Sequence, residues 1–70
     1  MAAENKFPIL LNGEEHLTKA VTAAALVAEQ NLDQEGVVVL MNGEVLPRDS
    51  WETNLKEGDE MELLRFVSGG

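Results

Sequence analysis

The sequence predicts an α+β fold, in which a single helix crosses one face of a β-sheet. Two Asn-Gly pairs, at residues 12–13 and 42–43, each separate two short stretches that are typical of strands. An alanine-rich stretch at residues 23–28 lies between these two hairpins and favours a helix. With 70 residues the chain has room for one sheet and one or two short helices, and we therefore expect one domain.

The first hairpin begins with residues 6–11, where apolar side chains recur with the period of a strand. Asn12-Gly13 follows directly, and both residues accept the positive φ angles that a two-residue hairpin turn requires. We therefore expect residues 14–18 to form a short second strand that pairs with the first. The face of the first strand that is expected to be buried carries Phe7, Ile9 and Leu11.

A helix is predicted over residues 21–30, because alanine and leucine favour helical backbone. Thr22 is the expected N-cap, with Val21 before it and Leu26 inside the helix placed to form a hydrophobic staple. Asn31 accepts the left-handed conformation that commonly ends a helix. The helix face expected to pack on the sheet carries Ala23, Leu26, Val27 and Gln30.

Residues 37–41 are five consecutive apolar residues and form the most strand-like stretch of the chain. The odd-numbered side chains share one face and the even-numbered ones the other, and both faces are apolar. A strand with two apolar faces is typical of the interior of a sheet, so we expect this strand to be central. Asn42-Gly43 then turns the chain into a strand over residues 44–46, which Pro47 ends.

The segment after this hairpin is expected to close one end of the core. Trp51 has the bulk to fill that end, and it follows a single helical turn that Asp49 or Ser50 is placed to cap. Leu55 adds a core contact in the next loop. Residues 57–59, Glu-Gly-Asp, supply a turn with glycine at the strained position.

The final strand is predicted over residues 60–67, and its alternation divides it into two faces. Met61 and Leu63 point one way, and we expect the helix to cover them. Glu62, Leu64 and Phe66 then lie on the open side of the sheet, together with Val38 or Leu40. The sequence thus predicts an exposed apolar patch that leads to the end of the chain.

The composition limits the classes of function. The formal net charge is −8, which disfavours nucleic-acid and anionic membrane partners and favours basic protein partners. Cysteine is absent, so the sequence provides no disulfide, thiolate metal ligand or cysteine nucleophile. A chain of this size has little room for a deep catalytic cleft, so we expect a carrier or binding protein and not an independent enzyme. No stretch has the length of a membrane span or the order of a signal peptide, so a cytoplasmic location is the default expectation.

The sequence ends in Ser68-Gly69-Gly70, which we expect to form a flexible tail on a domain that comprises residues 1–67. Gly69 has no Cβ and fits a narrow channel in conformations that other residues resist. The Gly70 carboxyl carbon has no branched side chain beside it to hinder attack. On the tail alone, a frayed end or a remnant of an expression vector is an equally valid interpretation.

Residues 42–51, Asn-Gly-Glu-Val-Leu-Pro-Arg-Asp-Ser-Trp, are similar to the Asn-Gly, Val-Pro-Arg and Trp segment of the ThiS family of ubiquitin-like sulfur carriers. Gly58-Asp59 and Ser68-Gly69-Gly70 extend the resemblance, which covers nearly the whole chain. It implies a β-grasp fold, a mixed sheet in which the first and last strands pair in the middle. Ala23 and Gln30 depart from the family, which usually has larger apolar residues there, so we expect a less tightly docked helix.

The resemblance implies a carrier that is itself the substrate of a ThiF-like adenylating enzyme, which uses ATP and Mg²⁺. The Gly70 carboxylate becomes an acyl-adenylate, and sulfur from a sulfur-donating persulfide enzyme converts it into a thiocarboxylate. A ThiG-like thiazole synthase then receives the sulfur for thiamin biosynthesis. The chain itself binds no cofactor or metal in this interpretation. The resemblance implies that Ser68 and Gly69 thread the tail into the partner enzyme. It implies that the partners dock on Leu64, Phe66 and Val67.

Other functions remain open at this point. The same chemistry serves other clients, as in a MoaD-like small subunit of molybdopterin synthase or in a carrier for tRNA thiolation. The Leu-Pro-Arg segment at residues 46–48 favours the thiazole pathway among these. A non-covalent β-grasp interaction module with an inert tail is a second class, and a modifier that joins its C-terminus to lysines is a third.

Several polar residues invite a catalytic or metal-binding role that we do not assign. His16 is the single histidine and has no fixed partner in the sequence, so a solvated or packing role is expected. Arg48 is expected either to pair with a nearby acid or to touch a partner. The acidic residues near the last strand are expected to be a solvated turn and strand edge instead of metal ligands: Glu57, Asp59, Glu60 and Glu62.

Overall fold

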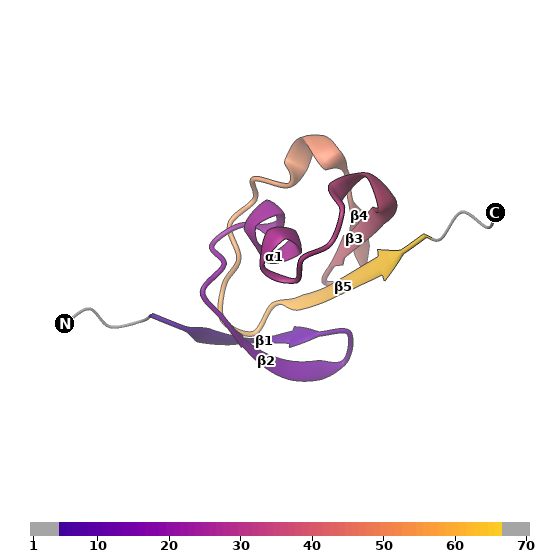
Figure 1. The fold of residues 1–70 in the computed structure, drawn as a ribbon. Helices are drawn as coiled ribbons and strands as arrows, with labels where there is room; N and C mark the ends of the chain where they lie inside the picture. The colour runs from indigo at the N-terminus through magenta and orange to yellow at the C-terminus, as the bar shows by residue number, and fades with distance from the viewer. Residues whose placement is uncertain (1–4, 67–70) are drawn as a thin grey trace.

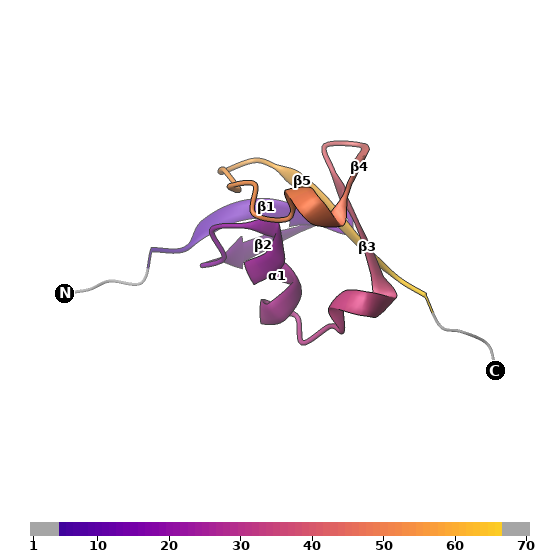
Figure 2. The same ribbon diagram turned by 90° about the horizontal axis from the view of Figure 1, so that it is seen from above.

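The computed structural model of this chain describes residues 5–66. Within these residues a five-stranded sheet has the strand order β2-β1-β5-β3-β4, and one α-helix, α1, crosses one of its faces (Figures 1 and 2). Two short 3₁₀ turns, η1 and η2, lie before β3 and after β4. The elements are β1 (Phe7–Leu11), β2 (Glu14–Thr18), α1 (Ala23–Glu29), η1 (Gln34–Gly36), β3 (Val37–Met41), β4 (Glu44–Leu46), η2 (Arg48–Ser50) and β5 (Glu60–Arg65).

The first and last strands pair in the middle of the sheet, as the resemblance implied. β1 and β5 run parallel, with Leu11 opposite Met61, and the other three pairs of neighbouring strands are antiparallel. The sheet is therefore mixed, and its arrangement with α1 is the expected β-grasp. β3 lies between β5 and β4 and is an inner strand, although β5 and not β3 occupies the middle position.

Both Asn-Gly pairs form the predicted hairpin turns. Asn12 and Gly13 have φ angles of 52° and 86°, and Asn42 and Gly43 have φ angles of 53° and 87°. Two consecutive positive φ angles are the signature of a type I′ turn, whose twist matches that of the flanking strands. The two-residue turns are therefore consistent with the register of both hairpins.

The predicted helix forms over a shorter range than expected. Thr22 is the N-cap, and its hydroxyl oxygen accepts a hydrogen bond from the Ala25 N–H at 3.1 Å. Asn31 has a φ angle of 60° and ends the helix as predicted. Val21 is largely exposed, so it buries little surface against Leu26 and the expected staple is weak. Ala23 is fully buried, whereas Gln30 is only half-buried and stays outside the core.

The core lies between α1 and the inner face of the sheet. Trp51 is 5% exposed, and its indole N–H donates a hydrogen bond to the Leu46 carbonyl at 3.1 Å, so it closes one end of the core as expected. Leu55 is also buried in the core, again as predicted. The buried apolar side chains are Ile9, Ala20, Ala23, Leu26, Val27, Val37, Val39, Trp51, Leu55, Met61 and Leu63.

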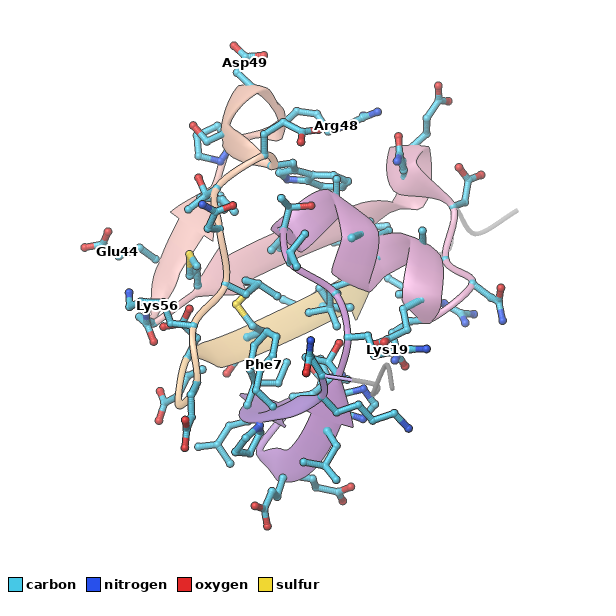
Figure 3. The ribbon with its side chains drawn as sticks, turned by 90° about the vertical axis from the view of Figure 1, so that its left-hand side faces the viewer. Phe7, Lys19, Glu44, Arg48, Asp49 and Lys56 are labelled. Carbon is cyan, nitrogen blue, oxygen red and sulfur yellow. The ribbon has the colours of Figure 1, made fainter. Side chains whose placement is uncertain are left out.

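Two expectations about short segments were wrong. Neither Asp49 nor Ser50 caps a helical turn, because both lie inside η2, which starts after Pro47 and has no side-chain cap. Asp49 points away from the body of the molecule (Figure 3). The last strand ends at Arg65, and Val67 lies outside the described residues. The sequence analysis also missed η1, which begins where the Asp33 carboxylate accepts a hydrogen bond from the Glu35 N–H.

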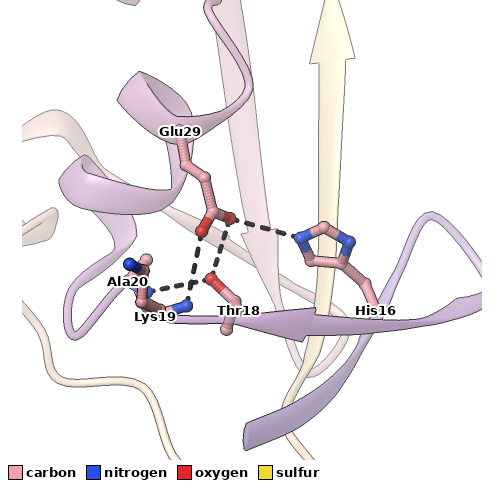
Figure 4. Close-up of polar contacts among 5 residues, drawn as sticks. All are labelled: His16, Thr18, Lys19, Ala20 and Glu29. Atoms are coloured by element: carbon pink, nitrogen blue, oxygen red, sulfur yellow. Dashed lines mark hydrogen bonds and ion pairs between the residues drawn. The ribbon is translucent and has the colours of Figure 1, made fainter. Parts of the chain in front are cut away.

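A polar cluster fastens the end of α1 to β2 (Figure 4). Glu29 accepts hydrogen bonds from the Thr18 hydroxyl at 2.8 Å and from the Lys19 N–H at 3.3 Å, and its carboxylate lies 3.2 Å from His16 Nε2. Thr18 is fully buried, and its oxygen also accepts from the Ala20 N–H. His16 therefore has a partner on the helix, and its role here is structural.

The same contacts set the protonation of Glu29. Burial raises the pKa of its carboxyl group, but hydrogen bonds from Thr18 and His16 and from the Lys19 N–H together lower the pKa below the ordinary value. A carboxyl group with a lowered pKa in the folded state stabilises the fold above its unfolded pKa. That stability is lost as the pH falls through the folded value.

We predict that Glu29→Gln lowers the free energy of unfolding at pH 7 by about 1 kcal/mol, because three hydrogen bonds to a partly exposed charge are weakened. The difference in the free energy of unfolding between the variant and the unsubstituted chain should shrink as the pH falls below about 4. There the Glu29 carboxyl group becomes protonated first in the unfolded and then in the folded chain. Urea unfolding at several pH values measures it, and the exposed Glu52→Gln is the matched control. An equal loss at low and neutral pH would show that the charge is not the cause.

No helix within residues 5–66 has both the length and the apolar character needed to cross a membrane.

Candidate functional site

The outer face of the sheet, opposite α1, presents an apolar patch made by three neighbouring strands. Val38 lies opposite Leu64 on β3 and β5, and Leu40 lies opposite Val45 on β3 and β4. Leu64 is 46% exposed and Val45 is 63% exposed, while Val38 and Leu40 are half-buried. We call these four residues, Val38, Leu40, Val45 and Leu64, the outer patch.

The strand alternation in β5 is the reason that Leu64 is exposed. Met61 and Leu63 are buried under α1, so the side chains between and beyond them point outward. The predicted exposure of Leu64 and Phe66 is confirmed, and Phe66 is 66% exposed directly after the strand. Val45 was not predicted as part of the patch, although its place opposite the outward Leu40 follows from the hairpin register.

Acidic side chains border the outer patch. Glu62 lies opposite Leu40 on the same face, and Glu60, two residues earlier on that face of β5, is also exposed. Fixed negative charge around an apolar surface steers basic partners toward it and repels acidic ones. The patch therefore suits a partner surface with an apolar centre and a basic rim.

A backbone hydrogen bond holds Phe66, the residue that follows β5. The Phe66 N–H donates to the Gly36 carbonyl at 2.9 Å, which joins the end of β5 to η1. A groove of about 390 Å³ lies beside this contact, between the loop after α1 and the residues Arg65 and Phe66. The remaining predicted site residues lie outside the described part of the chain: Val67, Ser68, Gly69 and Gly70.

A second apolar group lies on the outer face at the other side of the sheet. Leu17 on β2 is 58% exposed and lies opposite Pro8, and Leu10 on β1 is also exposed. Leu10 is paired with Glu60 on β5, so acidic residues of β5 separate this group from the outer patch. The sequence analysis did not identify it.

The acidic residues near β5 divide into a structural residue and solvated ones. Asp59 is 6% exposed, and its carboxylate accepts a hydrogen bond from the Lys56 N–H at 2.8 Å. The Lys56 ammonium group and the Asn42 side-chain amide also lie near it, at 3.9 Å and 3.4 Å. The expectation that Asp59 is solvated was therefore wrong, because it closes its own turn. Within residues 5–66, no three histidine or acidic side chains come together in a way that could hold a metal ion.

Arg48 forms no ion pair with an acidic side chain of residues 5–66. Its guanidinium group donates a hydrogen bond to the Gln34 side-chain oxygen at 3.1 Å, and its central carbon lies 4.8 Å from the centre of the Trp51 ring. η2 thereby contacts η1, the turn that also holds Phe66.

Comparisons with known proteins agree with this architecture. The model of the ThiS family matches residues 5–70. A solved structure, the thiamine biosynthesis protein ThiS from Geobacter metallireducens, superposes with a TM-score of 0.76 at 30% sequence identity, over 91% of this chain and all of that one.

A thiazole synthase from Paramagnetospirillum magneticum is 33% identical over 64 residues, which cover 89% of this chain. The chain spans only about a fifth of that protein, 20% of its length. The match to the family model includes all of the described residues and also the Gly69-Gly70 end, and the solved relative has the same fold. This chain therefore belongs to the ThiS family.

Proposed function

We propose that this chain is a sulfur carrier of thiamin biosynthesis, whose Gly70 carboxylate is adenylated and then converted into a thiocarboxylate. Membership of the ThiS family and the likeness to a thiamine biosynthesis protein support this proposal. In this role the chain is the substrate of its partner enzymes and not an enzyme itself. ATP and Mg²⁺ belong to the partner, a ThiF-like adenylating enzyme.

The proposal rests above all on the position of the outer patch. Leu64, one of its four residues, lies on β5, the strand that leads through Phe66 toward Gly70. Gly70 is four residues beyond Phe66, so its carboxyl group reaches at most about 14 Å from that residue. An enzyme that docks on Leu64 and Phe66 therefore holds the Gly70 carboxyl group within a short and limited distance of this contact.

The chemistry requires a better leaving group than the free carboxylate provides. In the proposed reaction a Gly70 carboxylate oxygen attacks the α-phosphorus of ATP, and pyrophosphate leaves. The terminal sulfur of an enzyme persulfide then attacks the acyl carbon, AMP leaves, and an acyl disulfide joins the two proteins. Two thiol groups of a reductant are then oxidised to a disulfide and supply the two electrons that cleave the acyl S–S bond, which leaves the thiocarboxylate on Gly70 and a thiol on the enzyme.

The thiazole pathway is favoured among possible clients by one comparison. A protein named as a thiazole synthase contains a segment that is similar to nearly all of this chain. Joining a carrier to its client in one protein raises the effective concentration of the carrier at the client's active site. We therefore propose a ThiG-like thiazole synthase as the acceptor of the sulfur, in preference to a molybdopterin or tRNA-thiolation enzyme.

Adenylation can be measured by incubating the chain with the adenylating enzyme of its host, ATP, Mg²⁺ and labelled pyrophosphate. We predict that label enters ATP only when the chain is present, because pyrophosphate reverses formation of the acyl-adenylate. Gly69→Val should lower kcat about tenfold or more, since a branched side chain displaces the reacting carboxylate. Glu52→Gln, at an exposed position without a role in the proposed site, is the control and should change kcat little. Exchange that is absent, or that does not depend on the chain, would contradict the proposal.

The outer patch gives a second prediction. Leu64→Glu should raise the KM for the chain in the same exchange reaction by about 10- to 100-fold, because a docking contact worth about 1.5–3 kcal/mol is replaced by a charge. Leu17→Glu, on the far edge strand of the same face, is the matched control. Circular dichroism and thermal unfolding should show that both variants fold. Equal KM values for the two variants would show that the adenylating enzyme does not dock on the outer patch.

A further inference from the structure

Arg48 is an exposed side chain that the fold holds in one position. The Trp51 ring lies below its guanidinium group at 4.8 Å, and the Gln34 side chain accepts one of its hydrogen bonds at 3.1 Å. Both neighbours are uncharged, and Trp51 is itself fixed by its hydrogen bond to the Leu46 carbonyl. The guanidinium group is therefore preorganised, and less rotamer entropy is lost when it binds another group.

The charge of Arg48 is not matched by a carboxylate among residues 5–66. Glu35 lines the same groove and Asp49 follows Arg48 in the sequence, yet neither forms an ion pair with it. Asp49 points away from the groove at the top of η2 (Figure 3). In a chain with 13 acidic and 5 basic residues, an arginine without a carboxylate partner is unexpected. Four of its five N–H donors remain for another group.

The groove beside Arg48 continues into the outer patch. It has a volume of about 230 Å³ and lies where β4 is too short to cover the start of β3. Its apolar lining includes Val38 and Val45, which are both members of the outer patch, and also Leu46 and Trp51. An enzyme that covers the outer patch therefore also reaches the guanidinium group of Arg48.

We propose that Arg48 pairs with a carboxylate of the adenylating enzyme and is a specificity-determining contact of the docking surface. The planar guanidinium group binds a carboxylate through two parallel hydrogen bonds, which fixes the orientation of the partner as well as its position. The acidic rim of the outer patch attracts a basic surface, and Arg48 requires one acidic residue at a defined place in it. This inference rests on the proposed function.

A purely structural role is the alternative. In that case Arg48 would only cover Trp51 and join η2 to η1, and its removal would change thermal stability without changing recognition. The two roles differ in the KM for the chain and in the salt dependence of that KM, since an ion pair between two proteins is screened by salt.

The test compares Arg48→Gln, Arg48→Lys and Lys56→Gln in the pyrophosphate exchange reaction with the host's adenylating enzyme. Arg48→Gln should raise the KM about tenfold or more, with kcat unchanged at saturation, because the hydrogen-bonded charge is lost and the tail is intact. Arg48→Lys should give an intermediate KM, because lysine keeps the charge but lacks the planar fork. Lys56→Gln removes the same charge from another exposed position and should leave the KM nearly unchanged.

The KM of the unsubstituted chain should also rise more steeply with salt than that of Arg48→Gln. If Arg48→Gln does not fold by circular dichroism, the KM of Arg48→Lys decides, and a value equal to that of the unsubstituted chain overturns the inference. A normal KM for Arg48→Gln, or an equal rise for Lys56→Gln, overturns it while the proposed function stands. If the unsubstituted chain supports no exchange, both proposals fall.

Discussion

Two asparagine side chains hold the central strand, and the rest of the structure depends on that clamp. The Asn12 side-chain oxygen accepts a hydrogen bond from the Leu63 N–H, and the Asn42 oxygen accepts one from the Glu60 N–H, both at 2.9 Å. The backbone N–H of Asn12 donates to Met61, and that of Asn42 donates to Glu60. Each hairpin turn therefore fastens one side of β5, which fixes the register of the strand between its two hairpins.

The clamp on β5 links the core to the docking surface. A strand shifted by one residue would exchange its two faces, so that Met61 and Leu63 would leave the core and Leu64 would enter it. With the register fixed, one face of β5 supports α1 and the other presents the outer patch. The same register brings the Phe66 N–H to the Gly36 carbonyl of η1. The proposed carrier function thus depends on contacts at two turns, far along the chain from Gly70.

The local features of the sequence predicted most of this architecture. Asn-Gly pairs, the Thr22 cap and the alternation of Met61, Leu63 and Leu64 act through neighbouring residues, so each could be recognised without knowledge of the fold. The pairing of β1 with β5 could not, because periodicity does not identify partners, and it came from the resemblance to a family. Val45 could have been found from the hairpin register.

The remaining features arise from contacts between distant segments. Asn12 and Asn42 were identified only as turn residues, because their hydrogen bonds to β5 depend on tertiary structure. Asp59 belongs to an acidic stretch of a kind that is usually exposed to solvent. It is nevertheless buried, and its carboxylate accepts a hydrogen bond from the Lys56 N–H of its own turn. Arg48 and Gln34 are 14 residues apart in the sequence, and their contact depends on η1, which the sequence analysis did not predict.

The central claim is that Gly70 carries sulfur, and the intact mass of the chain tests it most directly. The chain is incubated with ATP, Mg²⁺, the adenylating enzyme of its host, a persulfide donor and a thiol, and is then weighed. The account predicts that one oxygen is replaced by one sulfur, and that the change maps to Gly70 on fragmentation. An unchanged mass, or a chain joined through Gly70 to a lysine of another protein, would contradict it.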